Sequence, residues 1–177
     1  PIRQRLVQLA TATRGQDYTC VLMQGSGTFA VESMLGSTID RQGRLLVLAN
    51  GVYGNRLADI ARCLQIDHLV HDSGELAPPD LALLEQTLAE DEAITHVVVV
   101  HGETTTGMLN PLAEIAAIVK GHDRLLLVDS MSAFGGVPLD VGELGIDYIV
   151  SSANKCIQGV PGFGFIIGRT AHLETTR

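Results

Sequence analysis

Seven short apolar segments are spaced along the chain, and most of them run without a polar break. We predict strands at residues 18–23, 44–49, 66–70, 95–100, 125–129, 145–150 and 163–168. An unbroken apolar run is typical of a strand with both faces covered, as in a parallel sheet flanked by helices. The runs that end at Val100 and at Asp129 show this pattern most clearly.

Apolar residues at helical spacing lie between these segments. They predict helices at residues 1–13, 29–37, 56–65, 80–89 and 110–120. Strands and helices therefore alternate, with connections of the length that right-handed crossovers need. No internal repeat or linker divides the chain. We predict a single α/β domain over residues 1–177, with a mainly parallel sheet flanked by helices.

Composition and charge exclude several classes of protein. With 46% hydrophobic and 18% charged residues, the chain is typical of folded rather than disordered proteins. A formal net charge of -8 argues against a nucleic-acid partner. No apolar stretch is long enough to predict a membrane span, and no signal peptide opens the sequence. We therefore expect a cytoplasmic protein that binds neither nucleic acid nor membrane.

Cysteine and histidine spacing predicts neither a disulfide framework nor a metal site. Cys20, Cys63 and Cys156 are odd in number and far apart, as expected of reduced thiols. His68 and His71 lie near Asp72, but their spacing matches no standard zinc or iron motif.

Three polar features follow predicted strands. Residues 24–28, Gln-Gly-Ser-Gly-Thr, form a glycine turn that opens a helix, where backbone N–H groups, the helix dipole and two hydroxyls can hold a phosphate. Asp129 ends one strand, and Lys155 stands in a loop rich in serine and glycine. Because ligands gather at the carboxyl ends of parallel strands, we expect the three to lie together. An anion site, a carboxylate and an amine are what pyridoxal phosphate requires from a protein.

Each feature also has a plainer interpretation. Asp129 could cap a following helix, and a lysine in a polar loop is often only a solvated surface residue. The glycine turn lacks the Gly-Lys-Ser/Thr ending of a P-loop, so it supports nucleotide binding poorly. These alternatives remain open at the level of spacing and composition.

Five longer motifs add a family resemblance. QGSGTFAVES, NGVYGNR, HGETTTGMLNP, VDSMSAFGG and SSANKCIQGVPGFGF occur in this order. Together they resemble the class V, fold-type I aminotransferases, and the resemblance runs from about residue 6 to the last residues. It implies that the chain is the large domain that binds pyridoxal phosphate. It also implies that the chain is an excerpt, without the N-terminal segment and the C-terminal small domain of that family.

The resemblance assigns roles to the candidate residues. Lys155 would form the Schiff base and act as the base that moves a proton, and Asp129 would keep the ring nitrogen protonated. Tyr53, expected in a turn between glycines, would stack on the ring. The remaining contacts to the cofactor would come from Ser26, Gly27 and Thr28 at the phosphate, and from Thr104, Met131 and Asn154. Asn154 departs from the glutamine of some relatives. His101 and Glu103 are expected to hold their loop.

The resemblance also implies an activity. The expected reaction transfers the amino group of 2-aminoethylphosphonate to pyruvate, which gives phosphonoacetaldehyde and L-alanine, in a homodimer. Two alternatives remain. The chain could use the substrates of an alanine:glyoxylate or serine:pyruvate aminotransferase, or it could be a non-catalytic α/β module that binds a nucleotide at the glycine turn.

Overall fold

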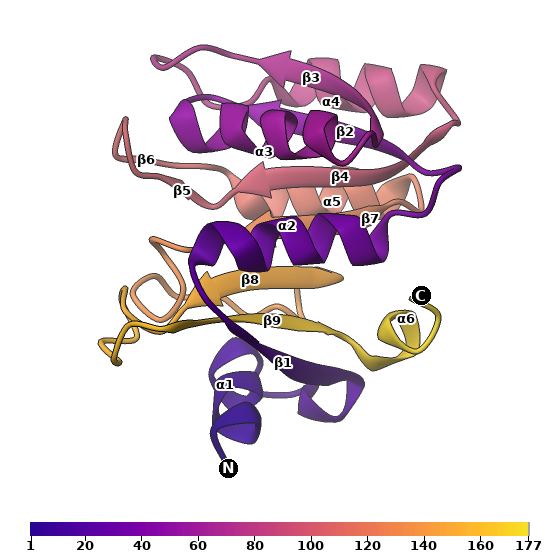
Figure 1. Ribbon diagram of the computed structural model, residues 1–177. Coiled ribbons are helices and arrows are strands. Elements are labelled where there is room, and N and C mark those ends of the chain that lie inside the picture. Colours follow the sequence, from indigo (N-terminus) through magenta and orange to yellow (C-terminus); the bar gives the residue numbers. More distant parts are fainter. Residues whose placement is uncertain (177) are drawn as a thin grey trace.

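A seven-stranded sheet forms the centre of the computed structural model, which describes residues 1–176 (Figure 1). The strand order is β1-β9-β8-β7-β4-β2-β3. Neighbouring strands from β8 to β3 pair in parallel, whereas β9 runs antiparallel to both β1 and β8. The strands are β1 (Tyr18–Gln24), β2 (Arg44–Ala49), β3 (Asp67–Asp72), β4 (Ile94–Val100), β7 (Leu125–Asp129), β8 (Tyr148–Ser152) and β9 (Phe163–Arg169). The predicted mainly parallel sheet is confirmed.

Helices cover both faces of this sheet (Figure 1). On one face α2 and α3 pack in a core cluster with alternate residues of the central strands. On the other face α1, α4 and α5 form a second cluster. The helices are α1 (Ile2–Ala10), α2 (Gly27–Thr38), α3 (Val52–Cys63), α4 (Leu81–Glu90), α5 (Leu112–Gly121) and α6 (Thr170–Leu173), with a short 3-10 turn at Gly15–Asp17. The predicted α/β class with flanking helices is confirmed.

The unbroken apolar runs form the strands that are most deeply buried. Leu45 to Leu48 on β2 and Val97 to Val99 on β4 have essentially no exposed surface. Both faces of these strands are covered, so each side chain loses its contact with water, which is worth about 1.5–3 kcal/mol per large aliphatic residue. The predicted bounds of β2 and β7, residues 44–49 and 125–129, agree with the observed ones.

The direction of the strands decides where the loops meet. Strands β1, β2, β4, β7 and β8 point the same way, so their carboxyl ends share one edge of the sheet. Because β9 runs in the opposite direction, the loop before it reaches the same edge. A small hairpin of β5 (Gly102–Glu103) and β6 (Met108–Leu109) follows β4 there.

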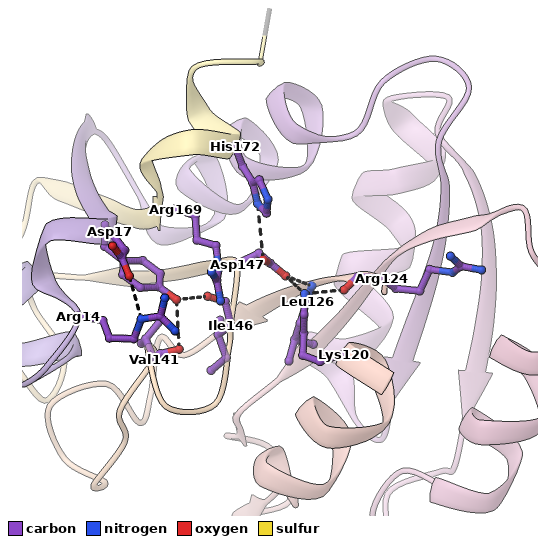
Figure 2. A network of polar contacts seen from close by, with 11 residues as sticks. Arg14, Asp17, Lys120, Arg124, Leu126, Val141, Ile146, Asp147, Arg169 and His172 are labelled. Carbon is purple, nitrogen blue, oxygen red and sulfur yellow. Dashed lines mark hydrogen bonds and ion pairs between the residues drawn. The ribbon is translucent and has the colours of Figure 1, made fainter. Parts of the chain in front are cut away.

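A buried carboxylate organises the opposite edge (Figure 2). Asp147, 1% exposed, accepts hydrogen bonds from the Lys120 ammonium at 2.6 Å and from the Leu126 backbone N–H at 2.8 Å. The Arg169 guanidinium lies 3.2 Å away and the His172 ring 3.5 Å away. The strand predicted at 145–150 begins only at Tyr148 because the preceding residues make this cluster and a turn in which Gly145 has a φ of +69°.

None of the helices in residues 1–176 combines the length and the apolar character that a membrane span requires.

Candidate active site

The loops at the carboxyl edge of the sheet enclose a cavity of about 440 Å³. Every residue that the sequence singled out as a cofactor contact lines it, so the fold brings together segments that lie up to about 130 residues apart. These residues are Ser26, Gly27, Thr28, Tyr53, Thr104, Asp129, Met131, Asn154 and Lys155. Their placement agrees with the predicted arrangement, whereas their functions remain predictions.

The glycine turn forms one wall of the cavity. Gly25 has a φ of +110°, a left-handed conformation that glycine adopts without strain, and its N–H donates to the Gly162 carbonyl at 3.1 Å. Ser26 is the N-cap of α2, and its hydroxyl accepts a hydrogen bond from the Phe29 N–H at 3.3 Å. Within residues 1–176 the N–H groups of Gly27 and Thr28 have no hydrogen-bond acceptor. These two donors and the helix dipole can hold an anion.

Asp129 lies at the end of β7 and is 5% exposed. Its Oδ1 accepts a hydrogen bond from the Met131 backbone N–H at 2.9 Å. The pKa of this carboxyl is raised to about 6, mainly by burial and also by Glu103, whereas the Met131 hydrogen bond and Arg56 oppose the rise. No helix begins between β7 and β8 in the described chain, so Asp129 is not a helix cap. The carboxylate instead faces the cavity.

Lys155 lies in the turn that follows β8, the neighbour of β7 in the sheet. Its side chain is exposed and lines the cavity, and its ammonium group makes no hydrogen bond or ion pair within residues 1–176. The other lysine of the chain, Lys120, is held by Asp147 at the far edge of the sheet. Lys155 is therefore the lysine whose amine is available to a ligand in the cavity.

Tyr53 does not lie in a turn, as the sequence predicted, but in the first turn of α3. The helix begins earlier because Glu103, from β5, replaces a local cap. One carboxylate oxygen of Glu103 accepts hydrogen bonds from the N–H groups of Tyr53 and Gly54, each at 3.1 Å. The other accepts from the backbone and the hydroxyl of Thr105. The Tyr53 ring still lines the cavity, and the Arg56 guanidinium lies 4.9 Å from its centroid.

The loop after β4 contributes a hydroxyl pair. Thr104 Oγ1 lies 2.6 Å from Ser132 Oγ, which follows β7. The His101 ring contacts the Ser130 hydroxyl at 3.0 Å beneath the cavity, and burial lowers the pKa of His101. These contacts agree with the expectation that His101 and Glu103 hold their loop.

Sequence reasoning missed several lining residues, including Arg56, Ser132 and Ser152. Arg56 lies three residues after Tyr53, a spacing that places both on one helix face only because α3 begins at Val52, four residues earlier than the sequence predicted. Ser132 carries no local signal, because its partner Thr104 lies 28 residues earlier.

The cavity fits pyridoxal phosphate in three independent respects. It offers a buried carboxylate for a cationic ring nitrogen, a free amine for the carbonyl carbon, and unpaired N–H donors at a helix start for the phosphate. An aromatic ring also stands at its wall.

Comparisons with known proteins agree with this geometry. The family model described as aminotransferase class-V matches residues 8–177. A curated relative from Klebsiella pneumoniae named 2-aminoethylphosphonate--pyruvate transaminase is 56% identical over 176 residues, 99% of this chain and 47% of its own length. One with the same name from Syntrophobacter fumaroxidans is 57% identical over 173 residues, 98% of this chain and 46% of its own. The chain thus spans about half the length of the curated relatives it matches.

Solved structures show the same fold. The alanine--glyoxylate aminotransferase of Nostoc sp. superposes with a TM-score of 0.85 at 26% identity, covering 98% of this chain and 46% of that one. The pyridoxamine-pyruvate aminotransferase of Mesorhizobium loti gives a TM-score of 0.84 at 26% identity, covering 97% and 45%. The predicted family is confirmed, and class-V aminotransferases depend on pyridoxal phosphate. The chain belongs to the class-V aminotransferases.

Proposed function

We propose that this chain is the cofactor-binding domain of an aminotransferase that transfers the amino group of 2-aminoethylphosphonate to pyruvate. The products are phosphonoacetaldehyde and L-alanine. One observation carries the reaction type: a single cavity holds the buried Asp129 carboxylate, the free Lys155 amine and the unpaired N–H groups of the glycine turn. Pyridoxal phosphate, when bound, supplies the electron sink that weakens a bond at the substrate carbon.

Lys155 has two tasks in this proposal. Its amine would hold the cofactor, and once free it would act as the base that moves a proton at the substrate carbon. Both tasks need a neutral nitrogen that no carboxylate holds. The absence of an ion pair to Lys155 within residues 1–176 supports this role.

Asp129 holds the proton on the ring nitrogen. A carboxylate with a raised pKa regains its charge when a cation is placed against it, because the opposite charge offsets the cost of burial. Ser26, Gly27 and Thr28 receive the phosphate, and the Tyr53 ring supports the flat face of the ring. Thr104, Met131 and Asn154 complete the contacts.

The substrate rests on similarity. Curated relatives at 51–57% identity carry the name 2-aminoethylphosphonate--pyruvate transaminase. The solved alanine--glyoxylate aminotransferase is 26% identical. The first substrate pair is therefore the better supported one, and an amine together with a 2-oxo acid follows from the aminotransferase family itself.

The proposal extends to assembly and compartment. Two copies of the enzyme form a homodimer in the cytoplasm, and residues 1–177 act as its large domain. The curated relatives are about twice as long, and their remaining length would supply the N-terminal segment and the small domain.

The distribution of lysines makes a decisive test possible. The chain is incubated with pyridoxal phosphate, reduced with borohydride and digested, and the modified peptide is identified by mass spectrometry. Modification of the peptide with Lys155 supports the proposal, whereas modification of Lys120 or of the N-terminus alone would remove its central residue. Loss of the visible absorbance band with 2-aminoethylphosphonate, but not with L-serine, supports the substrate. The opposite pattern would favour a serine:pyruvate activity.

A further inference from the structure

Arg56 lines the cavity but has no part in the function proposed above. It lies on α3 one turn after Tyr53, and its guanidinium stands over the Tyr53 ring at 4.9 Å from the centroid. It also lines a smaller cavity of about 30 Å³ between α2 and α3, together with Asp129 and Met131. Arg56 and Asp129 therefore line both cavities.

The guanidinium of Arg56 is not neutralised. Within residues 1–176 it forms no hydrogen bond and no ion pair, whereas Arg44 and Arg169 are both paired with aspartates. Glu103 forms no ion pair with Arg56 either, and both oxygens of that carboxylate accept hydrogen bonds from α3 and from Thr105 instead. Arg56 thus contributes an uncompensated positive charge to the wall of the cavity.

Titratable groups from four elements lie near Asp129. Glu103 comes from β5, Arg56 from α3 and Lys155 from the loop after β8, while His101 at the end of β4 is buried and has a lowered pKa. Burial raises the pKa of Asp129 and Glu103 adds to this effect, whereas the hydrogen bond from the Met131 N–H and, to a smaller extent, the charge of Arg56 lower it. Arg56 is therefore the side chain that favours the charged form of the buried carboxylate.

We propose that Arg56 is a positioning residue of this site, whose guanidinium stacks on the Tyr53 ring at the cavity wall and adds a positive charge that favours the ionised form of Asp129. The effect on Asp129 is a property of the chain without cofactor. Its value for catalysis rests on the proposed function, because an ionised carboxylate is what a protonated ring nitrogen needs.

The decisive experiment is an NMR titration of the Asp129 carboxyl carbon in the cofactor-free chain, assigned with Asp129→Asn. In Arg56→Met the apparent pKa of Asp129 should rise by about half a unit to one unit, since an opposite charge is lost. In Arg56→Lys, which keeps the charge, it should stay near the value of the unchanged chain. Arg62→Met is the matched control, because Arg62 lies on the same helix but pairs with Asp59 outside the cavity.

If the Asp129 carboxyl titrates at the same pH in the original sequence and in Arg56→Met, the proposed effect of Arg56 on Asp129 is wrong. The stacking is tested separately by the dissociation constant of pyridoxal phosphate, which should rise about two- to fivefold in Arg56→Lys, because a guanidinium stacks on the ring better than an ammonium. An unchanged dissociation constant in Arg56→Lys would show that stacking of Arg56 on Tyr53 does not support cofactor binding. If the unchanged chain captures no cofactor, the proposed function fails for this chain, while the titration still decides the role of Arg56 toward Asp129.

Discussion

Met131 occupies the space that a side chain at position 27 would fill. A Cβ atom added to Gly27 would lie 2.6 Å from the Met131 sulfur and 2.9 Å from its methyl carbon. Gly27 is the first residue of α2, so the close approach joins the proposed phosphate wall to the loop that follows Asp129. The glycine thus makes room for the Met131 side chain, and its backbone angles are not what calls for glycine here.

Gly27→Ala should consequently change the cavity more than the stability. The Met131 side chain is flexible and can move, so we expect the free energy of unfolding to change by less than about 1 kcal/mol. The displaced side chain enters the cavity and should weaken capture of pyridoxal phosphate about tenfold. Absorbance titration measures this loss. Met131→Ala added to Gly27→Ala restores the space, and failure to recover any affinity would contradict the packing explanation.

Glu103 should be one of the most important polar residues for stability. It is fully buried and accepts four hydrogen bonds, two of them from the start of α3. Glu103→Ala leaves these donors without an acceptor, which should cost about 3 kcal/mol in urea unfolding. Glu103→Gln keeps one acceptor oxygen and should cost less. Glu114→Gln, an exposed change in the first turn of α5, serves as the control.

The structure explains which parts of the fold were predictable. The strands β2 and β7 were predicted at their observed bounds because their apolar runs are continuous and end at polar residues. The start of α3 was not, since its cap comes from Glu103, about 50 residues later in the chain. The local sequence predicted a turn between glycines, whereas the hydrogen bonds to Glu103 stabilise a helix there.

In the candidate site, too, some residues could be predicted from local sequence and others depend on contacts between distant segments. Residues at strand ends, such as Asp129 and Lys155, follow from the rule that parallel strands bring their carboxyl ends together. The roles of Tyr53 and Thr104 needed the family resemblance, because nothing in their local sequence indicates a cofactor. Ser132 belongs to the cavity wall only through a contact with Thr104 across the sheet edge, which periodicity and spacing do not encode.

Asp129 should make the cofactor-free chain less stable as the pH rises. Its pKa is about 6 in the folded chain against an ordinary value of 3.8, so the folded state binds the proton more tightly. Stability is then lost between these two pH values, up to about 3 kcal/mol above pH 6. Asp129→Asn removes the buried charge, and it should stabilise the chain against urea by the full amount at about pH 8 but hardly at about pH 3.5, below the ordinary pKa of the carboxyl.

The control for this change is Asp123→Asn, at an exposed position where the backbone has a φ of +55°. Asparagine tolerates that conformation, so the substitution should have similar small effects at both pH values. The stabilising Asp129→Asn change should at the same time weaken capture of the cofactor, a trade of function for stability. Equal effects of Asp129→Asn at both pH values would show that the carboxyl is not perturbed.

Asp147 should stabilise the edge of the sheet opposite the cavity (Figure 2). Its carboxylate is buried between Lys120, Arg169 and the Leu126 N–H, so Asp147→Asn would leave two cations facing a neutral amide. Removing one partner of a buried ion pair costs about 3–5 kcal/mol, and we expect a loss of this size in urea unfolding. Because Asp147 is shielded from water whereas Lys120 and Arg169 are 31% and 24% exposed, high salt should reduce this loss only in part. Asp59→Asn, in the exposed pair with Arg62, should cost almost nothing and become undetectable when salt is added. A loss for Asp147→Asn as small as that of Asp59→Asn would mean that the cluster is only a consequence of the fold and not a source of its stability.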